Sequence, residues 1–286
     1  MKTSLLVVFI SLSLGSLYAQ KEKVKGNKIV STEQLDVDAF HSIEIYDNFE
    51  ITLDESSDPE LKIEADSNLQ EMIIAEVQDS ILTIKSSKDL RRAKALNLDI
   101  AYASELKKIT IYDKVNAKSL SPINSANLHV EINDNAEVFF TIDAGKVRYS
   151  SNGKASGELH VTAVEAIYQI NDNSELKGIV SSDSLNVDLY QKASAKLEGE
   201  VKSTLVRADN DTDFYGDKLI SNKMSIVSEA NSDCFIHVSV DVSIDAKDKA
   251  EIYILGDPKI SIDGFANEAT LYKKNIDYTP SKLRFN

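Results

Sequence analysis

The chain has 286 residues, of which 46 are acidic and 32 basic, so its formal net charge at pH 7 is −14. A field of that sign repels phosphate backbones and anionic headgroups, which argues against binding to nucleic acids or to a membrane surface. A single cysteine cannot form a disulfide within the chain, so the hydrophobic residues, 42% of the total, have to stabilise it by packing.

The segment from Met1 to Ala19 predicts a signal peptide. Lys2 gives a positively charged start, an apolar run extends from Leu5 to Leu14, and the small residue Ala19 stands where cleavage would occur. A run of about ten residues is too short to cross a bilayer, which takes roughly 20. No later segment is apolar enough to span a membrane. We therefore expect an exported protein, located in the periplasm, at the cell surface or outside the cell.

Residues 20–35 are expected to form an N-terminal extension, and residues 36–105 a β-rich cap. Apolar residues in the second region alternate with polar ones, for example at Ile43 and Ile45, which is typical of strands with one buried face. Exposed strand edges invite pairing with other chains. The cap is therefore expected to cover the first turn of the region that follows.

Two features of the cap need separate interpretation. Residues 68–77 predict a short helix, because Leu69, Ile73 and Val77 stand at helical spacing. Residues 91–94 (Arg-Arg-Ala-Lys) form a basic cluster, which we interpret as a solvated loop.

Residues 106–274 repeat with a period of 19. Stepping by 19 through this region passes along a column of mostly small residues: Ala117, Ala136, Ala155, Ser174, Ala193, Thr212, Asn231, Ala250 and Ala269. Around each of them, apolar residues two apart flank a polar break of Asn, Asp and Gly, which suit tight corners. The pattern predicts an all-β fold, a right-handed parallel β-helix of about nine turns that stack at about 4.8 Å. An antiparallel sandwich is the alternative, but it has no reason to keep one period across so many units.

The register of the repeat shifts in the seventh unit. That unit fits better when displaced by one residue, which directs five side chains inward: Met224, Ile226, Ser232, Cys234 and Ile236. The next unit is one residue shorter. A one-residue slip turns side chains to the opposite face, so we expect a β-bulge at a corner to absorb it. The last unit starts one residue early, at Ile260 and Ile262, and residues 275–286 are expected to form a tail.

Motifs at both ends of residues 36–274 carry a family resemblance. The first group is Phe40-x-x-Ile43-x-Ile45, Phe49-x-Ile51-x-Leu53, Leu61-x-Ile63-Glu64-Ala65 and Val77-x-Asp79-x-x-Leu82-x-Ile84, and the second is Ala250-Glu251-Ile252-Tyr253, Gly256-Asp257-Pro258, Ile260 and Gly264. Together they resemble the head GIN domain family of auto-transporter adhesins. The resemblance implies a bacterial, exported, β-helical protein of uncharacterised activity. The chain departs from the family's Gly-Ser-Gly-rich corners by using Asp and Asn.

The sequence indicates no metal site, cofactor site or catalytic residue. The four histidines, His41, His129, His160 and His237, show no zinc-binding spacing, and the last two stand about four turns apart, whereas zinc ligands lie about 2 Å from the metal. The Asp and Asn corners raise the question of calcium. However, no EF-hand loop or calcium-binding nonapeptide is present, and turn chemistry accounts for residues 133–135 and 171–173.

Parallel β-helices also host polysaccharide lyases and hydrolases, which use clustered carboxylates and a cation. Here the outward acidic residues look scattered, and Arg148 and Arg207 stand about three turns apart. Cys234 is expected to be a buried structural thiol, because no basic neighbour would lower its pKa. We therefore predict a non-enzymatic, adhesin-like protein that presents its β-helix surface to a glycan or an envelope protein. The alternatives are a carbohydrate-active enzyme and a structural component of the cell envelope.

Overall fold

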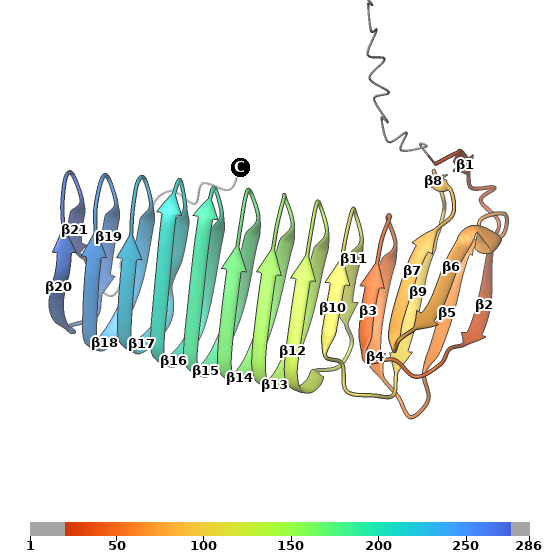
Figure 1. The fold of residues 1–286 in the computed structure, drawn as a ribbon, viewed down its shortest axis with the longest axis horizontal. Coiled ribbons are helices and arrows are strands. Elements are labelled where there is room, and N and C mark those ends of the chain that lie inside the picture. The colour runs from red at the N-terminus through yellow and green to blue at the C-terminus, as the bar shows by residue number, and fades with distance from the viewer. Residues whose placement is uncertain (1–20, 276–286) are drawn as a thin grey trace, which may run out of the picture.

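The computed structural model describes residues 21–275, which form an all-β chain coiled into a long stack of strands (Figure 1). The predicted signal peptide, residues 1–19, lies outside the described residues, as does the predicted tail from residue 276 onward. Within the described part, no helix has the length and apolar character needed to cross a bilayer.

Parallel strands build the coil from residue 108 onward. They are β10 (Lys108–Ile111), β11 (Asn116–Ser119), β12 (Ile123–Ile132), β13 (Glu137–Ser151), β14 (Ser156–Ile170), β15 (Glu175–Gln191), β16 (Ser194–Asn210), β17 (Asp213–Ser228), β18 (Asp233–Ala246), β19 (Glu251–Leu255), β20 (Lys259–Phe265) and β21 (Thr270–Lys273). Consecutive turns pair in parallel, mostly at a separation of 19 in the sequence, as between β13 and β14 and between β14 and β15. The predicted β-solenoid of about nine turns is confirmed.

Each long strand bends once and so contributes to two opposed sheets. Sheet one contains β10, β12, the second halves of β13 to β18, and β20. Sheet two contains β11, the first halves of β13 to β18, β19 and β21. The two sheets meet across the core: Gly157 of sheet two faces Tyr149 of sheet one, and a methyl group at Gly157 would overlap the tyrosine hydroxyl.

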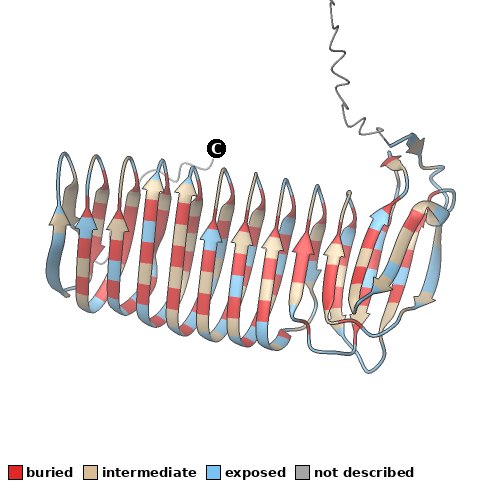
Figure 2. Cartoon of the chain, viewed as in Figure 1, coloured by how far each residue is buried: buried red, intermediate tan, exposed pale blue. Residues whose placement is uncertain are grey.

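Inward side chains alternate with outward ones along every turn, so buried and exposed residues alternate along the arrows of Figure 2. The small residues of the repeat lie inside, where they let the chain turn closely at each corner. The buried members of this column are Ala136, Ala155, Ser174, Ala193, Thr212, Ser232 and Ala250.

The column begins differently from the prediction. Asn116 pairs with Glu137, so Val115 precedes Ala136, whereas Ala117 pairs with Val138. The prediction that Ala117 starts the column is therefore wrong. The first turn has two additional residues between Lys118 and Ile123, since these positions pair with residues 139 and 142 of the next turn.

The register slip of the seventh unit is confirmed. Asp213 pairs with Asp233 at a separation of 20, and Asp233 pairs with Glu251 at a separation of 18. The bulge, however, does not lie at a corner as predicted. Lys196 pairs with Tyr215 but Glu198 pairs with Lys218, so β17 takes up the additional residue within the strand, between Tyr215 and Lys218. In the last turn, Ile260 pairs with Val242 at a separation of 18, which confirms the early start.

The corners depend on residues with left-handed backbones. Their positive φ angles recur once a turn, at Asp113, Asp134, Gly153, Asp172, Gln191, Asn210, Ala230, Asp248 and Asn267. Asn and Asp tolerate this conformation better than other side chains. One position before these residues, an amide ladder runs through three rungs: Asn152 donates to Asn133 at 2.8 Å, and Asn171 donates to Asn152 at 2.9 Å.

The cap precedes and extends the coil. Its elements are β3 (Ser42–Ile45), β4 (Glu50–Glu55), β5 (Glu60–Asp66), the 3-10 turn Gln70–Met72, β6 (Ile73–Gln78), β7 (Ile81–Ser86), β8 (Asp89–Arg91) and β9 (Leu96–Tyr102). Two further strands, β1 (Lys23–Lys25) and β2 (Val30–Asp36), belong to the predicted N-terminal extension and pair with β8 and β5. β3 joins sheet one and β4 joins sheet two, each in parallel. Beyond them, antiparallel pairs β2–β5, β5–β9 and β6–β7 close the end.

The helix predicted over residues 68–77 is wrong. Only a single 3-10 turn forms there, and Ile73 then begins β6. Ile73, Ile74 and Val77 are β-branched and favour a strand, and β7 is available to pair with them.

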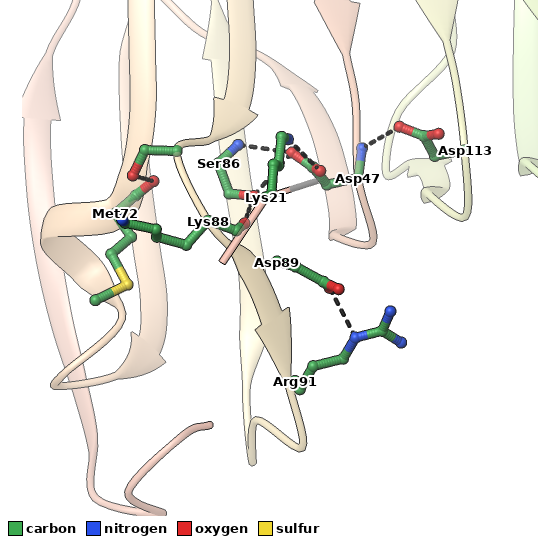
Figure 3. Close-up of polar contacts among 9 residues, drawn as sticks. Lys21, Asp47, Met72, Ser86, Lys88, Asp89, Arg91 and Asp113 are labelled. Carbon is green, nitrogen blue, oxygen red and sulfur yellow. Dashed lines mark hydrogen bonds and ion pairs between the residues drawn. The ribbon is translucent and has the colours of Figure 1, made fainter. Parts of the chain in front are cut away.

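Asp47 of the cap makes several polar contacts, and one of them reaches the coil: its backbone amide donates a hydrogen bond to the carboxylate of Asp113 at 2.8 Å (Figure 3). The carboxylate of Asp47 accepts hydrogen bonds from the amide and hydroxyl of Ser86, at 2.7 and 2.9 Å, and its other oxygen pairs with Lys21 at 2.7 Å. In the same view, Arg91 pairs with Asp89 at 2.7 Å. The basic side chains of residues 91–94 are exposed, as predicted for a solvated segment, although Arg91 ends β8.

Candidate binding surface on sheet two

Sheet two displays two columns of outward side chains, one residue per rung. The first outer column contains Glu137, Ser156, Glu175, Ser194, Asp213, Asp233, Glu251 and Thr270. The second outer column, two positions further along each strand, contains Phe139, Glu158, Lys177, Lys196, Tyr215, Phe235, Tyr253 and Tyr272. Parallel stacking at a fixed register aligns side chains that lie one full turn apart in the sequence.

A groove follows the corner of sheet two from β14 to β18. We call it the corner groove, and it encloses about 770 Å³. Its carboxylates are Glu175, Asp211, Asp213 and Asp233, its lysines are Lys154 and Lys192, and Asn173 and Asn231 add amide groups. Such a lining offers both donors and acceptors of hydrogen bonds to a polar ligand.

A second hollow lies on the same side of sheet two, nearer the cap. We call it the N-terminal hollow, and it encloses about 580 Å³. Glu50, Glu64, Asp99, Glu137, Glu158 and Lys118 contribute its charged groups. Phe139 also lines it and is 41% exposed, and its ring forms a T-shaped pair with the His160 ring, with 5.3 Å between the ring centroids. An exposed aromatic ring gives the hollow one apolar surface.

The corner groove corrects one interpretation of the sequence. The acidic residues looked scattered, but the structure brings four of them into one groove. Asp213 and Asp233 are direct neighbours on adjacent rungs, about 4.8 Å apart along the stack. The sequence signal that could have found these acidic residues is the 19-residue repeat, followed along its outward positions instead of its inward ones. Because the slip displaces Asp233 by one residue, the uncorrected step of 19 misses the pair.

The histidines remain apart, as the repeat predicts. His160 lies on β14 and His237 on β18, with β15, β16 and β17 between them. His41 hydrogen-bonds Ser42 at 2.9 Å, and burial lowers the pKa of His129. Within residues 21–275, no group of three or more His, Cys, Asp and Glu side chains is arranged to hold a metal ion.

The two arginines and the cysteine also lie as predicted. Arg148 belongs to β13 and Arg207 to β16, three turns apart, and Arg207 pairs with Asp188 at 3.0 Å. Cys234 is fully buried, and burial raises the pKa of its thiol to about 12. A thiol in that state is neither nucleophilic nor a ready metal ligand.

Comparison with protein families gives one match. The family described as "Putative auto-transporter adhesin, head GIN domain" matches residues 39–178 and 149–258. No curated protein sequence matches the chain.

Several solved structures share the fold. A "putative adhesin" from Parabacteroides distasonis superimposes with a TM-score of 0.70 at 16% identity, over 88% of this chain and 100% of that one. A "putative adhesin" from Parabacteroides merdae gives 0.63 at 18% identity, over 88% and 99%. A "putative lipid binding protein" from Parabacteroides distasonis gives 0.61 at 15% identity, over 88% and 100%. At these identities the likeness concerns the fold.

Proposed function

The chain belongs to the auto-transporter adhesin head GIN domain family, and from this premise we propose that it is an exported, non-enzymatic binding protein whose sheet two contacts a glycan or an envelope protein. The observation that carries this proposal is the pair of hollows on one side of sheet two. A rigid coil holds them in fixed relation, so one extended ligand could lie along both.

The chemistry of the lining favours a glycan. Carboxylates, amides and lysines bind hydroxyl groups, and the exposed ring of Phe139 offers an apolar surface for one face of a sugar. An acidic groove would also repel anionic polysaccharides, so a neutral or amino sugar is the better fit. The relative named as lipid-binding suggests another ligand. The charged linings of both hollows, however, suit a hydroxyl-rich ligand better than an acyl chain.

A glycan array and pull-downs from envelope fractions test the proposal. Two variants, Asp213→Asn with Asp233→Asn in the corner groove and Phe139→Ala in the N-terminal hollow, should each weaken binding. Glu71→Gln is the matched control, because Glu71 is exposed in the cap and lines neither hollow. Absence of any ligand above background, or equal binding by all variants, would count against this surface.

The corner groove also favours a second candidate function, a carbohydrate-active enzyme. Asp213 and Asp233 are adjacent, Glu175 lies two rungs from Asp213, about 10 Å away, and Lys192 stands between them at the corner. Glycosidases use a carboxylate pair at comparable spacing. Incubation with polysaccharides and an assay for new reducing ends tests it. Binding without release of reducing ends would exclude hydrolysis, whereas release that Asp213→Asn abolishes would establish it.

Membership of the family implies export. We propose that residues 1–19 are removed after Ala19, which the mass of the secreted protein would test. Cell fractionation combined with surface proteolysis would separate an adhesin from a structural envelope component. A structural component would stay in the envelope and resist competition by soluble glycans.

A further inference from the structure

The last turn of the coil leaves two strand edges open. β20 pairs with β18 and β21 pairs with β19, and within residues 21–275 neither strand has a neighbour on its far side (Figure 1). Along such an edge, every second residue directs its N–H and C=O groups away from the sheet, and these groups invite a further strand. The other end of the coil differs, because the antiparallel pairs β5–β9 and β6–β7 close it.

Inward side chains of this last turn are exposed as well. Ile260 and Ile262 are 40% and 55% exposed, whereas Val242 and Ile244, their neighbours on the rung before, are 2% and 0% exposed. Phe265, at the end of the same strand, is 44% exposed. Figure 2 draws β20 as mostly exposed, beside turns whose strands carry buried bands. Along the described chain, no further rung covers the core from this side, so an apolar surface remains.

The charge of the last turn does not oppose association. Acidic residues outnumber basic ones by 14 in the whole chain, so contact between two copies is generally unfavourable. Residues 257–274, however, are neutral. They contain three acidic residues and three basic ones, namely Asp257, Asp263 and Glu268 against Lys259, Lys273 and Lys274. Two copies can therefore approach through this end without the repulsion that the rest of the molecule carries.

We propose that a second copy of the chain binds this end, so that two coils join end to end about a two-fold axis. The axis passes through both sheets at right angles to their strands. It therefore pairs β20 antiparallel with β20 of the second copy, and it brings β21 against β21 of the second copy. One neighbour thus meets both open edges, and the inward side chains of the two copies continue as one core.

The sequence of β20 fits this antiparallel pairing. Ile260 and Ile262 point inward with Val242 and Ile244, so the residues between and beside them point outward. With Ser261 on the axis, Ile260 of each copy lies opposite Ile262 of the other on the inner face.

On the outer face, the same register sets Lys259 of each copy opposite Asp263 of the other. Both side chains are exposed. Opposite charges in directly facing positions stabilise a pair of strands, whereas like charges destabilise it. The register thus joins apolar side chains inside and complementary charges outside.

This arrangement has a consequence for the candidate binding surface. An axis at right angles to the sheets places sheet two of both copies on the same side of the dimer. Two corner grooves and two N-terminal hollows then face one way. Two linked sites bind a repeating ligand more tightly than either site alone. The inference itself does not rest on that ligand, because association is measured without it.

Light scattering coupled to size-exclusion chromatography of the full chain tests the proposal. We expect twice the mass of a single chain. Lys259→Glu and Asp263→Lys each set like charges opposite one another, so each should weaken association at least about tenfold. The combined variant restores opposite charges across the axis and should recover the dimer. Lys85→Glu, at an exposed position of the cap, is the charge-matched control and should leave association unchanged.

Disulfide cross-linking locates the axis. Ser261→Cys places a thiol opposite its own counterpart, so mild oxidation should yield a covalent dimer. Ser225→Cys is the matched control, because Ser225 lies two rungs back in the same outward column. About 24 Å would separate the two thiols of that variant, which is too far for a disulfide. The native Cys234 is buried and does not compete.

Three outcomes would overturn the inference. The unmodified chain could remain a monomer at the highest concentration tested. A dimer could tolerate both single charge reversals while Ser261→Cys fails to cross-link, which would place the contact elsewhere. Slow hydrogen exchange at the β20 amides of a monomer would assign this edge to another segment of the same chain. Circular dichroism verifies the fold of each variant, and recovery in the combined variant separates loss of contact from unfolding.

Discussion

The carboxylate of Asp113 accepts a hydrogen bond of 2.8 Å from the backbone amide of Asp47, although 66 residues separate them in the chain. The same relationship joins Asp134 to the amide of Asp113 at 3.0 Å, and Asp172 to the amide of Gly153 at 2.8 Å. Each of these amides belongs to the left-handed residue of a corner. A side chain of one turn thus completes the hydrogen bonding of the turn before it.

Replacing Asp113 tests this corner contact. Asp113→Ala should lower the free energy of unfolding by about 2 kcal/mol, because it removes one hydrogen bond and places alanine at φ 58°. Asp113→Asn keeps an acceptor oxygen and tolerates the left-handed backbone, so it should cost less than about 1 kcal/mol. Equilibrium urea unfolding measures both. Equal losses in the two variants would show that the side-chain contact contributes nothing.

Because of the amide ladder, replacing its central asparagine by alanine should lower the free energy of unfolding more than replacing an asparagine outside the ladder. Asn152 both donates to Asn133 and accepts from Asn171, so Asn152→Ala should cost about 1–2 kcal/mol of unfolding free energy. Asn127 is exposed, and its side chain lies outside the ladder, so Asn127→Ala is the control. Unfolding midpoints that shift equally in the two variants would contradict a role for the ladder.

Removing a buried tyrosine hydroxyl that lacks a hydrogen-bond partner should not destabilise the fold. Tyr149 and Tyr168 are fully buried, with their rings edge to face and the ring centroids 6.0 Å apart, and within the described residues the hydroxyl of Tyr168 has no hydrogen-bond partner. Because an unpaired buried hydroxyl costs free energy, Tyr168→Phe should leave stability unchanged or raise it by about 1 kcal/mol. Tyr46→Phe is the contrast, since that hydroxyl donates to Glu44 at 3.3 Å and its loss should be slightly unfavourable. A clear loss in Tyr168→Phe would reveal a partner.

The same tyrosines predict that stability falls in alkali. Burial raises the pKa of both phenols, so they stay neutral in the fold, whereas in the unfolded chain they ionise near pH 10. Their contribution is complete below about pH 10 and is lost as the pH rises, by up to about 1.4 kcal/mol per pH unit for each group. Urea unfolding between about pH 9 and 11 measures the slope. Tyr149→Phe with Tyr168→Phe should flatten it, and an unchanged slope would contradict the burial of these groups.

The contact between Gly157 and Tyr149 predicts strain from one added methyl group. Gly157→Ala would place a methyl against the tyrosine hydroxyl across the core, and overpacking of this kind costs about 1–3 kcal/mol. Ser156→Ala, one position earlier on the outward side, should be close to neutral. Combining Gly157→Ala with Tyr149→Phe should recover part of the loss, because the two positions are in contact. Additive losses in the double variant would show that the hydroxyl is not the obstacle.

The sequence was most informative where one rule repeats. A period of 19 with small residues at one position predicted the solenoid, its inward face and the slip near Cys234. The exceptions were local. Two additional residues before Ile123 moved the start of the column from Ala117 to Val115, and the apolar column alone could not show this because both residues suit an inward position.

The candidate surface was less predictable than the fold. Outward residues carry no hydrophobic period, so the alignment of Asp213 with Asp233 became visible only once the register of β17 and β18 was fixed. The same holds for the stacked rings of Tyr215, Phe235, Tyr253 and Tyr272 in the second outer column. Tyr215 and Tyr253 lie two full turns apart in the sequence, and only the slip by a single position places Phe235 between them.

The long turn from Asp213 to Asp233 is followed by a short one that ends at Glu251, after which the chain is back in phase. Insertions and deletions in this protein should therefore comprise complete turns of the coil. Loss or duplication of one complete circuit would shorten or lengthen the molecule while every remaining outward column stayed aligned. A gain of a single residue must be offset one circuit later, or all side chains beyond it exchange the inside for the outside. The length of the coil can therefore change by whole turns more easily than the number of residues within any one turn.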